Sequence, residues 1–404
     1  MPFMKRRLIY YNKDEYFMQE LNVNNPVIRI PNAYSPGVEV AGIEVPDTQF
    51  IRVPYSHDTY AKELDIGPEV LTDIKRNGKQ RDWQGRKERT ILLSESYIRL
   101  DMDNKAGRVY SCGNHLEFKE GIYTKEKLFH LGYFCRVLLC PLCAARRTEK
   151  IFGQTNKIMN HIEQHNNFKY IFLTLTIKNV KGQDLSNTIT DMFDAFHRLL
   201  KRKEFVAISQ GWQRSMEVTH NWVRNDYHPH IHCIIAVNPS YFKNKDYIKH
   251  EKWVNLWSEC MRLDYVPWVN ILAVKPRLDD TDVVEGEIKY GKVIAEITKY
   301  TAKSNDYIMP EKYGYSEKTR YKRTDEAVFY FDKGLAHRRL VAYGGMFKDI
   351  HKQLNLDDPI DGNLQDINGD EKMREDIAWV IKKYKWHYGL NNYFSYIPKN
   401  EQYK

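Results

Sequence analysis

The stretch Tyr227–Val237 reads Tyr-His-Pro-His-Ile-His-Cys-Ile-Ile-Ala-Val, so three alternating histidines run into an apolar segment. Successive side chains of a β-strand point to opposite faces, and His228, His230 and His232 are therefore expected on one face, here called the histidine face. The other face would be apolar and comprises Ile231, Cys233, Ile235 and Val237. Alternate residues lie about 7 Å apart along a strand, and imidazoles at that spacing can converge on one cation.

A carboxylate ligand for the same site is expected from the preceding strand. Residues 214–222 predict a strand that forms a hairpin with the histidine strand. If Arg224 and Asn225 centre the turn, Glu217 lies opposite His232, on the histidine face. A shift of one residue would place Glu217 on the wrong face of the sheet.

In that register, Glu217, His230 and His232 form a site of two histidines and one carboxylate. Mixed nitrogen and oxygen ligands suit Mn²⁺ or Mg²⁺ with positions left open for phosphate oxygens. His228 is the competing third ligand, and its alternative role is contact with DNA or with the tyrosine described next.

The segment Val293–Tyr307 predicts a single helix, because apolar residues recur at helical spacing without Gly or Pro. On that helix Glu296, Tyr300 and Lys303 would share one face. A tyrosine between a carboxylate and an ammonium group is a candidate nucleophile. The unperturbed phenol pKa is about 10, so attack near neutral pH would need activation by a metal, a cation or a base.

Four cysteines cluster in a pattern that predicts a structural zinc site: Cys112, Cys135, Cys140 and Cys143. The Cys-Pro-Leu-Cys knuckle can seat two thiolates on one tetrahedral ion. The wide gap between Cys135 and Cys140 leaves His115 or His130 as replacements for one cysteine. The rival interpretation of the knuckle is a redox pair.

These motifs, taken in order, resemble a known family. Phe-Leu-Thr-Leu-Thr at 172–176 precedes the histidine motif, and Glu-x-x-x-Tyr-x-x-Lys follows it. With the cysteines and the segments at 340–348 and 354–358, they resemble the rolling-circle plasmid replication initiators (Rep) of Gram-positive bacteria. Those proteins belong to the His–hydrophobic–His (HUH) endonuclease superfamily. The resemblance covers roughly residues 106 to 365.

The resemblance implies a metal-dependent DNA strand-transferase that nicks and rejoins a plasmid origin. Tyr300 would attack a phosphate of the double-strand origin, leaving a 5′-phosphotyrosine and a 3′-hydroxyl primer. Glu296 would serve as general base for water at termination, and Lys303 would orient the phosphate or the phenolate. Origin DNA, as a hairpin or single-stranded nick site, and a host helicase and polymerase are the implied partners.

Composition fits this interpretation without requiring it. The chain has 404 residues and a formal net charge of +9, which is compatible with a polyanionic partner. No apolar run is long enough for a transmembrane helix, and a cytoplasmic location is expected. The basic pairs and triplets are candidate phosphate contacts, or alternatively solvated surface. They comprise Arg146, Arg147, Lys201, Arg202 and Lys203.

Periodicity predicts an α+β fold with a ferredoxin-like antiparallel sheet, helices on one face, and a small zinc module before it. Strands are expected at 169–177, 214–222, 228–237 and 269–274, and helices at 146–165, 185–200, 245–262 and 293–307. The predicted domains are 1–105 of unassigned fold, 106–150 as the zinc module, 151–345 as the endonuclease and 346–404 as a C-terminal extension.

Three alternatives to the plasmid initiator stay open at this point. The first is a single-strand DNA transposase of the same superfamily. The second is a metal-dependent hydrolase that forms no covalent intermediate. The third is a zinc-bearing DNA-binding regulator without catalysis.

Overall fold

The computed structural model describes residues 6–11, 16–21, 69–75, 78–276, 290–299, 301–365 and 378–398. The chain divides into two compact units. The smaller unit comprises Met1–Gln84, Gly113–Phe129 and Ala378–Lys404, and the larger comprises Gly85–Cys112 and His130–Ile377. The predicted boundary between residues 150 and 151 falls inside one helix, α4, which spans Pro141–His165.

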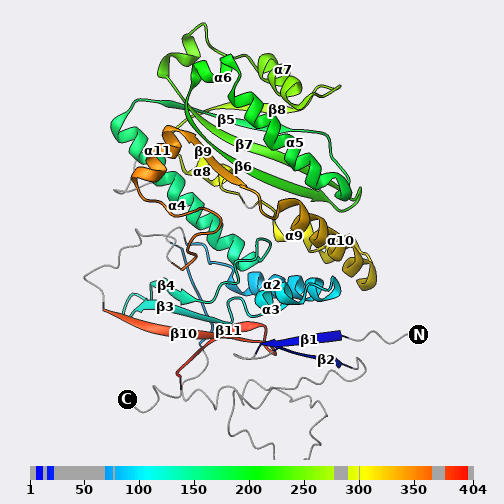
Figure 1. The fold of residues 1–404 in the computed structure, drawn as a ribbon. Helices are drawn as coiled ribbons and strands as arrows, with labels where there is room; N and C mark the ends of the chain where they lie inside the picture. The colour runs from blue at the N-terminus through cyan, green and yellow to red at the C-terminus, as the bar shows by residue number, and fades with distance from the viewer. Residues whose placement is uncertain are drawn as a thin grey trace, which may run out of the picture. The chain divides into compact units, whose positions relative to one another are not determined.

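A five-stranded antiparallel sheet forms the centre of the larger unit (Figure 1). The strand order is β8-β5-β7-β6-β9. Its strands are β5 (Lys169–Thr176), β6 (Ser209–Asn221), β7 (Asp226–Val237), β8 (Val269–Val274) and β9 (Val341–Gly345). The α+β class and the antiparallel sheet expected from the sequence are confirmed. The four predicted strands occur at the predicted places, with β6 beginning five residues earlier than expected.

Helices cover both faces of this sheet, so the expectation of helices on one face is wrong. Helix α5 (Gly182–Leu200) crosses the apolar face (Figure 1), and its Phe196 ring lies 5.2 Å from the ring of Trp212 on β6. Helices α4, α8 (Gly291–Ile297) and α11 (Met346–Gln353) lie on the histidine face. The physical reason is visible in β7, where every residue from Pro229 to Val237 is buried, whichever way it points.

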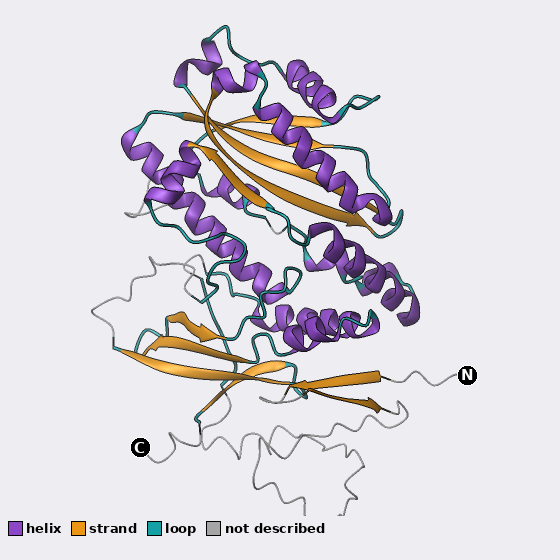
Figure 2. Ribbon diagram, viewed as in Figure 1, coloured by secondary structure: helices purple, strands orange, loops and turns teal. Residues whose placement is uncertain are grey.

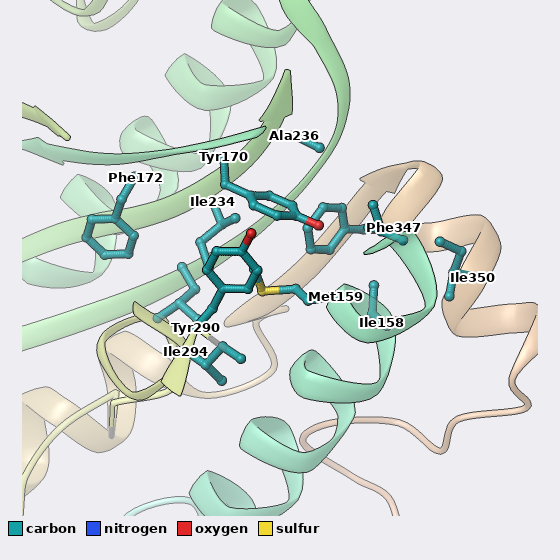
Figure 3. Packing of buried hydrophobic residues seen from close by; sticks show 12 residues of the cluster. Ile158, Met159, Tyr170, Phe172, Ile234, Ala236, Tyr290, Ile294, Phe347 and Ile350 are labelled. Atoms are coloured by element: carbon teal, nitrogen blue, oxygen red, sulfur yellow. The ribbon is translucent and has the colours of Figure 1, made fainter. Parts of the chain in front are cut away.

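The core on the histidine face joins segments far apart in the chain (Figure 3). Tyr170 and Phe172 of β5 pack with Ile234 and Ala236 of β7. Helices α4, α8 and α11 close over them with aliphatic and aromatic side chains that include Met159, Ile294 and Phe347. Strand β7 is therefore apolar at its carboxyl end on the same face that carries histidines at its amino end.

The described chain has further helices, which Figure 2 distinguishes from strands by colour. They are α2 (Trp83–Arg99), α3 (Asp103–Tyr110), α6 (Lys203–Ile208), α7 (His250–Met261), α9 (Ser304–Tyr307) and α10 (Glu317–Leu335), with short 3₁₀ helices η2 (Pro239–Lys243) and η3 (Glu311–Tyr313). No helix among the described residues is long and apolar enough to cross a membrane.

A second sheet, of order β11-β10-β3-β4, is formed mostly by residues of the smaller unit. Its strands are β3 (His115–Gly121), β4 (Lys127–Gly132), β10 (Trp379–His387) and β11 (Asn392–Tyr396), and β1 (Arg6–Tyr11) pairs with β2 (Tyr16–Leu21) separately. Trp83 packs against Phe118 and Phe129, with ring centroids 5.8 and 5.7 Å away. Strands from residues 115 and 379 onward thus share one sheet, which the sequence did not predict.

The predicted helix over 293–307 is broken in the structure. Helix α8 ends at Ile297 and α9 begins at Ser304. Tertiary hydrogen bonds explain the break: the Ser215 hydroxyl donates to the Ile297 carbonyl at 2.6 Å, and the Val218 amide donates to the Thr301 carbonyl at 2.7 Å. Strand β6 thereby binds carbonyls that a continuous helix would have used itself.

Candidate metal centres

The hairpin of β6 and β7 sets which residues meet on the histidine face. Glu217 pairs with His230, and Ser215 pairs with His232. The predicted pairing of Glu217 with His232 is therefore wrong by two residues. The loop is longer than assumed, because the Asn221 carboxamide oxygen accepts from the Val223 and Arg224 amides at 3.0 Å each and holds a four-residue turn. A shift of two residues preserves the face, so Glu217 still lies beside the histidines.

Glu217, His230 and His232 form a compact, buried cluster. One carboxylate oxygen, Oε2, lies 3.0 Å from Nε2 of His230 and 3.0 Å from Nε2 of His232. The three side chains offer ligand atoms within 4.8 Å of one another. They lie at the centre of the sheet, where two adjacent strands fix all three backbone positions.

The hydrogen bonds on the far side of each ring indicate a place for a cation. His230 Nδ1 lies 3.1 Å from the backbone oxygen of His228, and a carbonyl can only accept, so Nδ1 carries a proton. A neutral His230 then presents a bare Nε2 to the Glu217 carboxylate, and two acceptors repel at 3.0 Å. Either a second proton or a metal ion between the atoms relieves this. The donor set therefore fits a divalent ion.

His232 is oriented by a different partner. Its Nδ1 lies 3.2 Å from the hydroxyl of Thr174 on β5. Groups that hold the second nitrogen of a metal-ligating histidine fix the ring and its tautomer. Burial lowers the pKa of His232, against the opposing effect of Glu217, and this favours the neutral form that binds metal ions.

Lys303 completes the charge balance of the cluster. Its ammonium lies 3.0 Å from Oε1, the second carboxylate oxygen of Glu217, and half of the side chain is exposed. Burial alone would raise the pKa of Glu217, but its contacts with His230 and His232 and the charge of Lys303 hold that pKa well below its usual range. The carboxylate is thus ionised and ready to bind a cation.

His228 is placed outside this group. It pairs with Thr219, two residues along β6 from Glu217, and its ring centroid lies 5.3 Å from that of His230. Burial lowers its pKa. Between the two predicted third ligands, the structure brings Glu217 rather than His228 to the His230 and His232 side chains.

The predicted nucleophile, Tyr300, lies outside the described residues. Ile297, three residues before it, is hydrogen-bonded to Ser215, and Thr301, directly after it, is hydrogen-bonded to Val218. Ser215 and Val218 lie on either side of Glu217 in β6. Glu296 is partly exposed and pairs with Lys299. Burial lowers the pKa of His232, and the negative charge of Glu296 opposes this to a smaller extent.

The four predicted cysteines come together in a second cluster. The sulfur of Cys112 lies 3.6 Å from that of Cys143 and 3.5 Å from that of Cys140, and Cys135 lies 3.6 Å from Cys143. Disulfide sulfurs are about 2.0 Å apart, whereas tetrahedral ligands at a Zn–S distance of about 2.3 Å are about 3.8 Å apart. The geometry fits one tetrahedral Zn²⁺, and neither His115 nor His130 is needed.

Local structure supports the thiolates. Cys140 is the N-cap of α4, so the first turn of the helix directs its free amides toward the sulfurs. The buried Lys87 ammonium donates to the carbonyls of Tyr110 and Cys112 at 2.7 and 2.8 Å. Burial lowers the pKa of Lys87 to about 8, although the nearby cysteine thiolates oppose this. A cation here offsets the excess negative charge of four thiolates around a divalent ion.

Two predicted DNA contacts have another role. Arg146 and Arg147 are each only 5% exposed. Arg146 donates to the carbonyls of Leu364 and Gln365, and Arg147 donates to those of Ile360 and Arg136. The expectation that they contact phosphates is wrong, because their donors are used on backbone carbonyls. Lys201 and Lys203 are exposed, and Arg202 pairs with Glu259 at 2.8 Å.

Sequence reasoning missed three side chains beside these clusters, namely Lys87, Thr174 and Ser215, and it missed the contact of Lys303 with Glu217. Thr174 had a signal, because it is a polar residue between two leucines of an interior strand. Lys87 had none, since it lies in a helix whose relation to the cysteines depends on the tertiary fold.

Comparison with known proteins agrees with the motifs. The family model described as Replication protein matches residues 126–394. A "Protein rep" from Bacillus amyloliquefaciens is 36% identical over 349 residues, covering 83% of this chain and 99% of the relative. A "Protein rep" from Streptococcus pneumoniae is 33% identical, covering 80% and 95%. A "Replication protein" from Staphylococcus aureus is 34% identical, covering 60% and 97%. No solved structure matches the chain.

The fold and sites define an α+β protein with a carboxylate–histidine cluster on an antiparallel sheet and a separate closed thiolate cluster. The chain belongs to the Replication protein family. The family resemblance read from the motifs is thereby confirmed.

Proposed function

We propose that this chain initiates plasmid replication by nicking one strand of the double-strand origin and rejoining DNA at termination. The observation that carries the proposal is the Glu217 oxygen 3.0 Å from Nε2 of both His230 and His232. An ionised carboxylate shared by two oriented imidazoles, near a partly exposed ammonium, is suited to holding a phosphodiester through a cation.

The residues that would hold a divalent ion, Mn²⁺ or Mg²⁺, are Glu217, His230 and His232. When bound, such an ion polarises a non-bridging phosphate oxygen and offsets the charge that develops during displacement. Thr174 and the His228 carbonyl keep the rings in the tautomer that directs Nε2 inward. The four cysteines would hold Zn²⁺ as part of the fold.

Tyr300 is the proposed nucleophile. Its phenolic oxygen would form a bond to phosphorus while the bond from phosphorus to the 3′ oxygen breaks, which leaves a 5′-phosphotyrosyl link and a free 3′-hydroxyl. The support comes from the neighbouring described residues, since Ile297 and Thr301 are bound to β6 on both sides of Glu217. The 3′-hydroxyl would prime rolling-circle synthesis by a host polymerase, with a host helicase opening the duplex.

Glu296 and Lys303 have distinct proposed roles. Glu296 is partly exposed at the end of α8, where it would take a proton from water at termination. Lys303 contacts Glu217 at 3.0 Å, so it would hold the carboxylate as well as orient the phosphate. Lys201, Arg202 and Lys203 remain proposed phosphate contacts on the surface, and the four-domain division remains a prediction.

A single-stranded oligonucleotide that carries the origin nick sequence tests the proposal. The expected result is a protein–DNA adduct that survives denaturation, requires a divalent ion and disappears in Tyr300→Phe. Tyr313→Phe, another tyrosine of the following segment, is the matched control and should form the adduct normally.

Other outcomes identify other proteins. Cleavage without an adduct would indicate a metal-dependent hydrolase, and DNA binding alone would indicate a regulator. Joining of element ends in place of origin nicking would indicate a transposase. Each of these results contradicts the proposed initiator.

A further inference from the structure

An exposed tryptophan lies at the edge of the histidine face. Trp268 directly precedes β8, the edge strand, and is 62% exposed. Two other tryptophans of this unit, Trp253 and Trp257 of α7, are by contrast fully buried. Exposing the large apolar ring of an indole to water costs free energy. An exposed indole beside a polar site is therefore a candidate ligand-binding residue.

The register of the sheet fixes where Trp268 lies. Strands β5 and β8 are antiparallel, and Leu175 pairs with Val269. Continuing this pairing by one residue sets Trp268 opposite Thr176. A hydrogen bond of 2.8 Å from the Thr176 hydroxyl to the Trp268 carbonyl holds the two segments together at this point.

The same row continues to the metal cluster. Thr176 pairs with His230, and His230 pairs with Glu217. Residues directly opposite one another in a sheet share a face. Thr176, His230 and Glu217 therefore form one row across β5, β7 and β6 on the histidine face, and Trp268 extends that row just before β8. Two strand spacings, about 10 Å, separate the backbone of Trp268 from that of His230.

The surroundings of Trp268 suit a nucleotide. Lys178, two residues beyond β5, is exposed, and its ammonium lies 4.0 Å above the ring of Tyr265, three residues before Trp268. Exposed aromatic rings and cations are the features that hold single strands, because bases stack on the rings and phosphates attract the cations.

We propose that Trp268 stacks on an unpaired base of the origin strand near the phosphate that is cut, and so positions that strand across the sheet. This inference rests on the proposed function, because it takes the Glu217 cluster as the phosphate site. It adds a base-binding position directly before β8 that none of the sequence motifs contains.

Equilibrium binding of the full-length protein to the origin oligonucleotide, measured in a Tyr300→Phe background so that no cleavage occurs, tests the inference. Trp268→Ala and Trp268→Leu should each weaken binding by about 5- to 150-fold, the range measured for loss of one base–aromatic stack. Trp268→Phe keeps a ring and should retain most of the affinity. Tyr123→Ala, which removes an exposed aromatic ring of the smaller unit, should bind as the wild type does.

A series of oligonucleotides with single abasic sites near the nick identifies the stacked base. One abasic position should weaken binding to the wild type and have no further effect on Trp268→Ala. In adduct assays the variant should show a raised KM with kcat nearly unchanged. Equal abasic profiles for wild type and Trp268→Ala, or equal affinities, would overturn the inference. Loss of the wild-type adduct with a normal abasic difference would overturn the proposed function instead.

Discussion

The two clusters of the larger unit differ in how they are built. The cysteine cluster is closed: four soft ligands surround one point, every sulfur is buried, and the N-terminus of α4 and Lys87 supply compensating charge. The histidine cluster offers three harder ligands and borders a half-exposed ammonium at Lys303. Closed tetrahedral sites stabilise folds, whereas sites with open positions admit a substrate. The comparison teaches that ligand number and enclosure, rather than metal binding as such, distinguish a site suited to stabilising a fold from a site suited to binding a substrate.

Replacing one cysteine ligand should have the largest effect. Cys143→Ser is expected to lose the zinc and unfold the region around α3 and α4, because structural Zn²⁺ contributes about 10–16 kcal/mol in small zinc modules. Metal analysis of the purified protein and thermal unfolding measure this. Cys260→Ala removes a buried cysteine outside the cluster and should keep one zinc per chain. Purified wild-type protein without zinc would contradict the closed structural site.

Glu217→Gln should affect activity far more than stability. The amide keeps the shape of the side chain but removes the charge that the two imidazoles share. The affinity for Mn²⁺ should fall at least about 10- to 100-fold, which is the loss typical of changing even an indirect partner of a metal ligand. Isothermal titration and adduct yield against Mn²⁺ concentration measure it. If the Glu217→Gln protein were unfolded, the histidine cluster would be needed for folding as the cysteine cluster is, and the proposed difference between the two clusters would be wrong.

Arg147 tests whether a basic pair serves the fold or the DNA. Its guanidinium donates to the carbonyls of Arg136, Val137 and Leu138, in the loop between Cys135 and Cys140. Arg147→Met should lower the free energy of unfolding by about 2–3 kcal/mol, since buried carbonyls lose a charged donor. Lys201→Met, an exposed change of the same charge, should leave stability unchanged. A weakened DNA affinity without loss of stability in Arg147→Met would favour phosphate contact.

Thr174→Val should give the smallest effect. It removes the hydroxyl that holds His232 Nδ1 at 3.2 Å while keeping the volume of the side chain. Metal affinity should fall about tenfold, with the fold intact. Thr176→Val is the control on the same strand and face, because its hydroxyl contacts a backbone carbonyl instead of a histidine. Equal losses in both variants would mean that the hydroxyl of Thr174 has no special role.

Much of the candidate site could be predicted from local pattern. Alternation placed His230 and His232 on one face, and cysteine spacing brought four thiols together as a group. The exact partner of Glu217 could not be predicted, because turn length depends on the Asn221 side chain and the loop it stabilises. The helix predicted over 293–307 is longer than the observed helices, because residues of β6 donate hydrogen bonds to the carbonyls of Ile297 and Thr301.

The amino-acid sequence by itself determined the strand and helix periods, the ligand types and the family, since these depend on residues close together in the chain. Only the tertiary structure decided that helices cover both sheet faces, that Arg146 and Arg147 are buried, and that Lys303 and Thr174 reach the histidine cluster. The physical reason is that burial and hydrogen-bond partners are set by segments distant in sequence, where local pattern carries no information about which groups will meet.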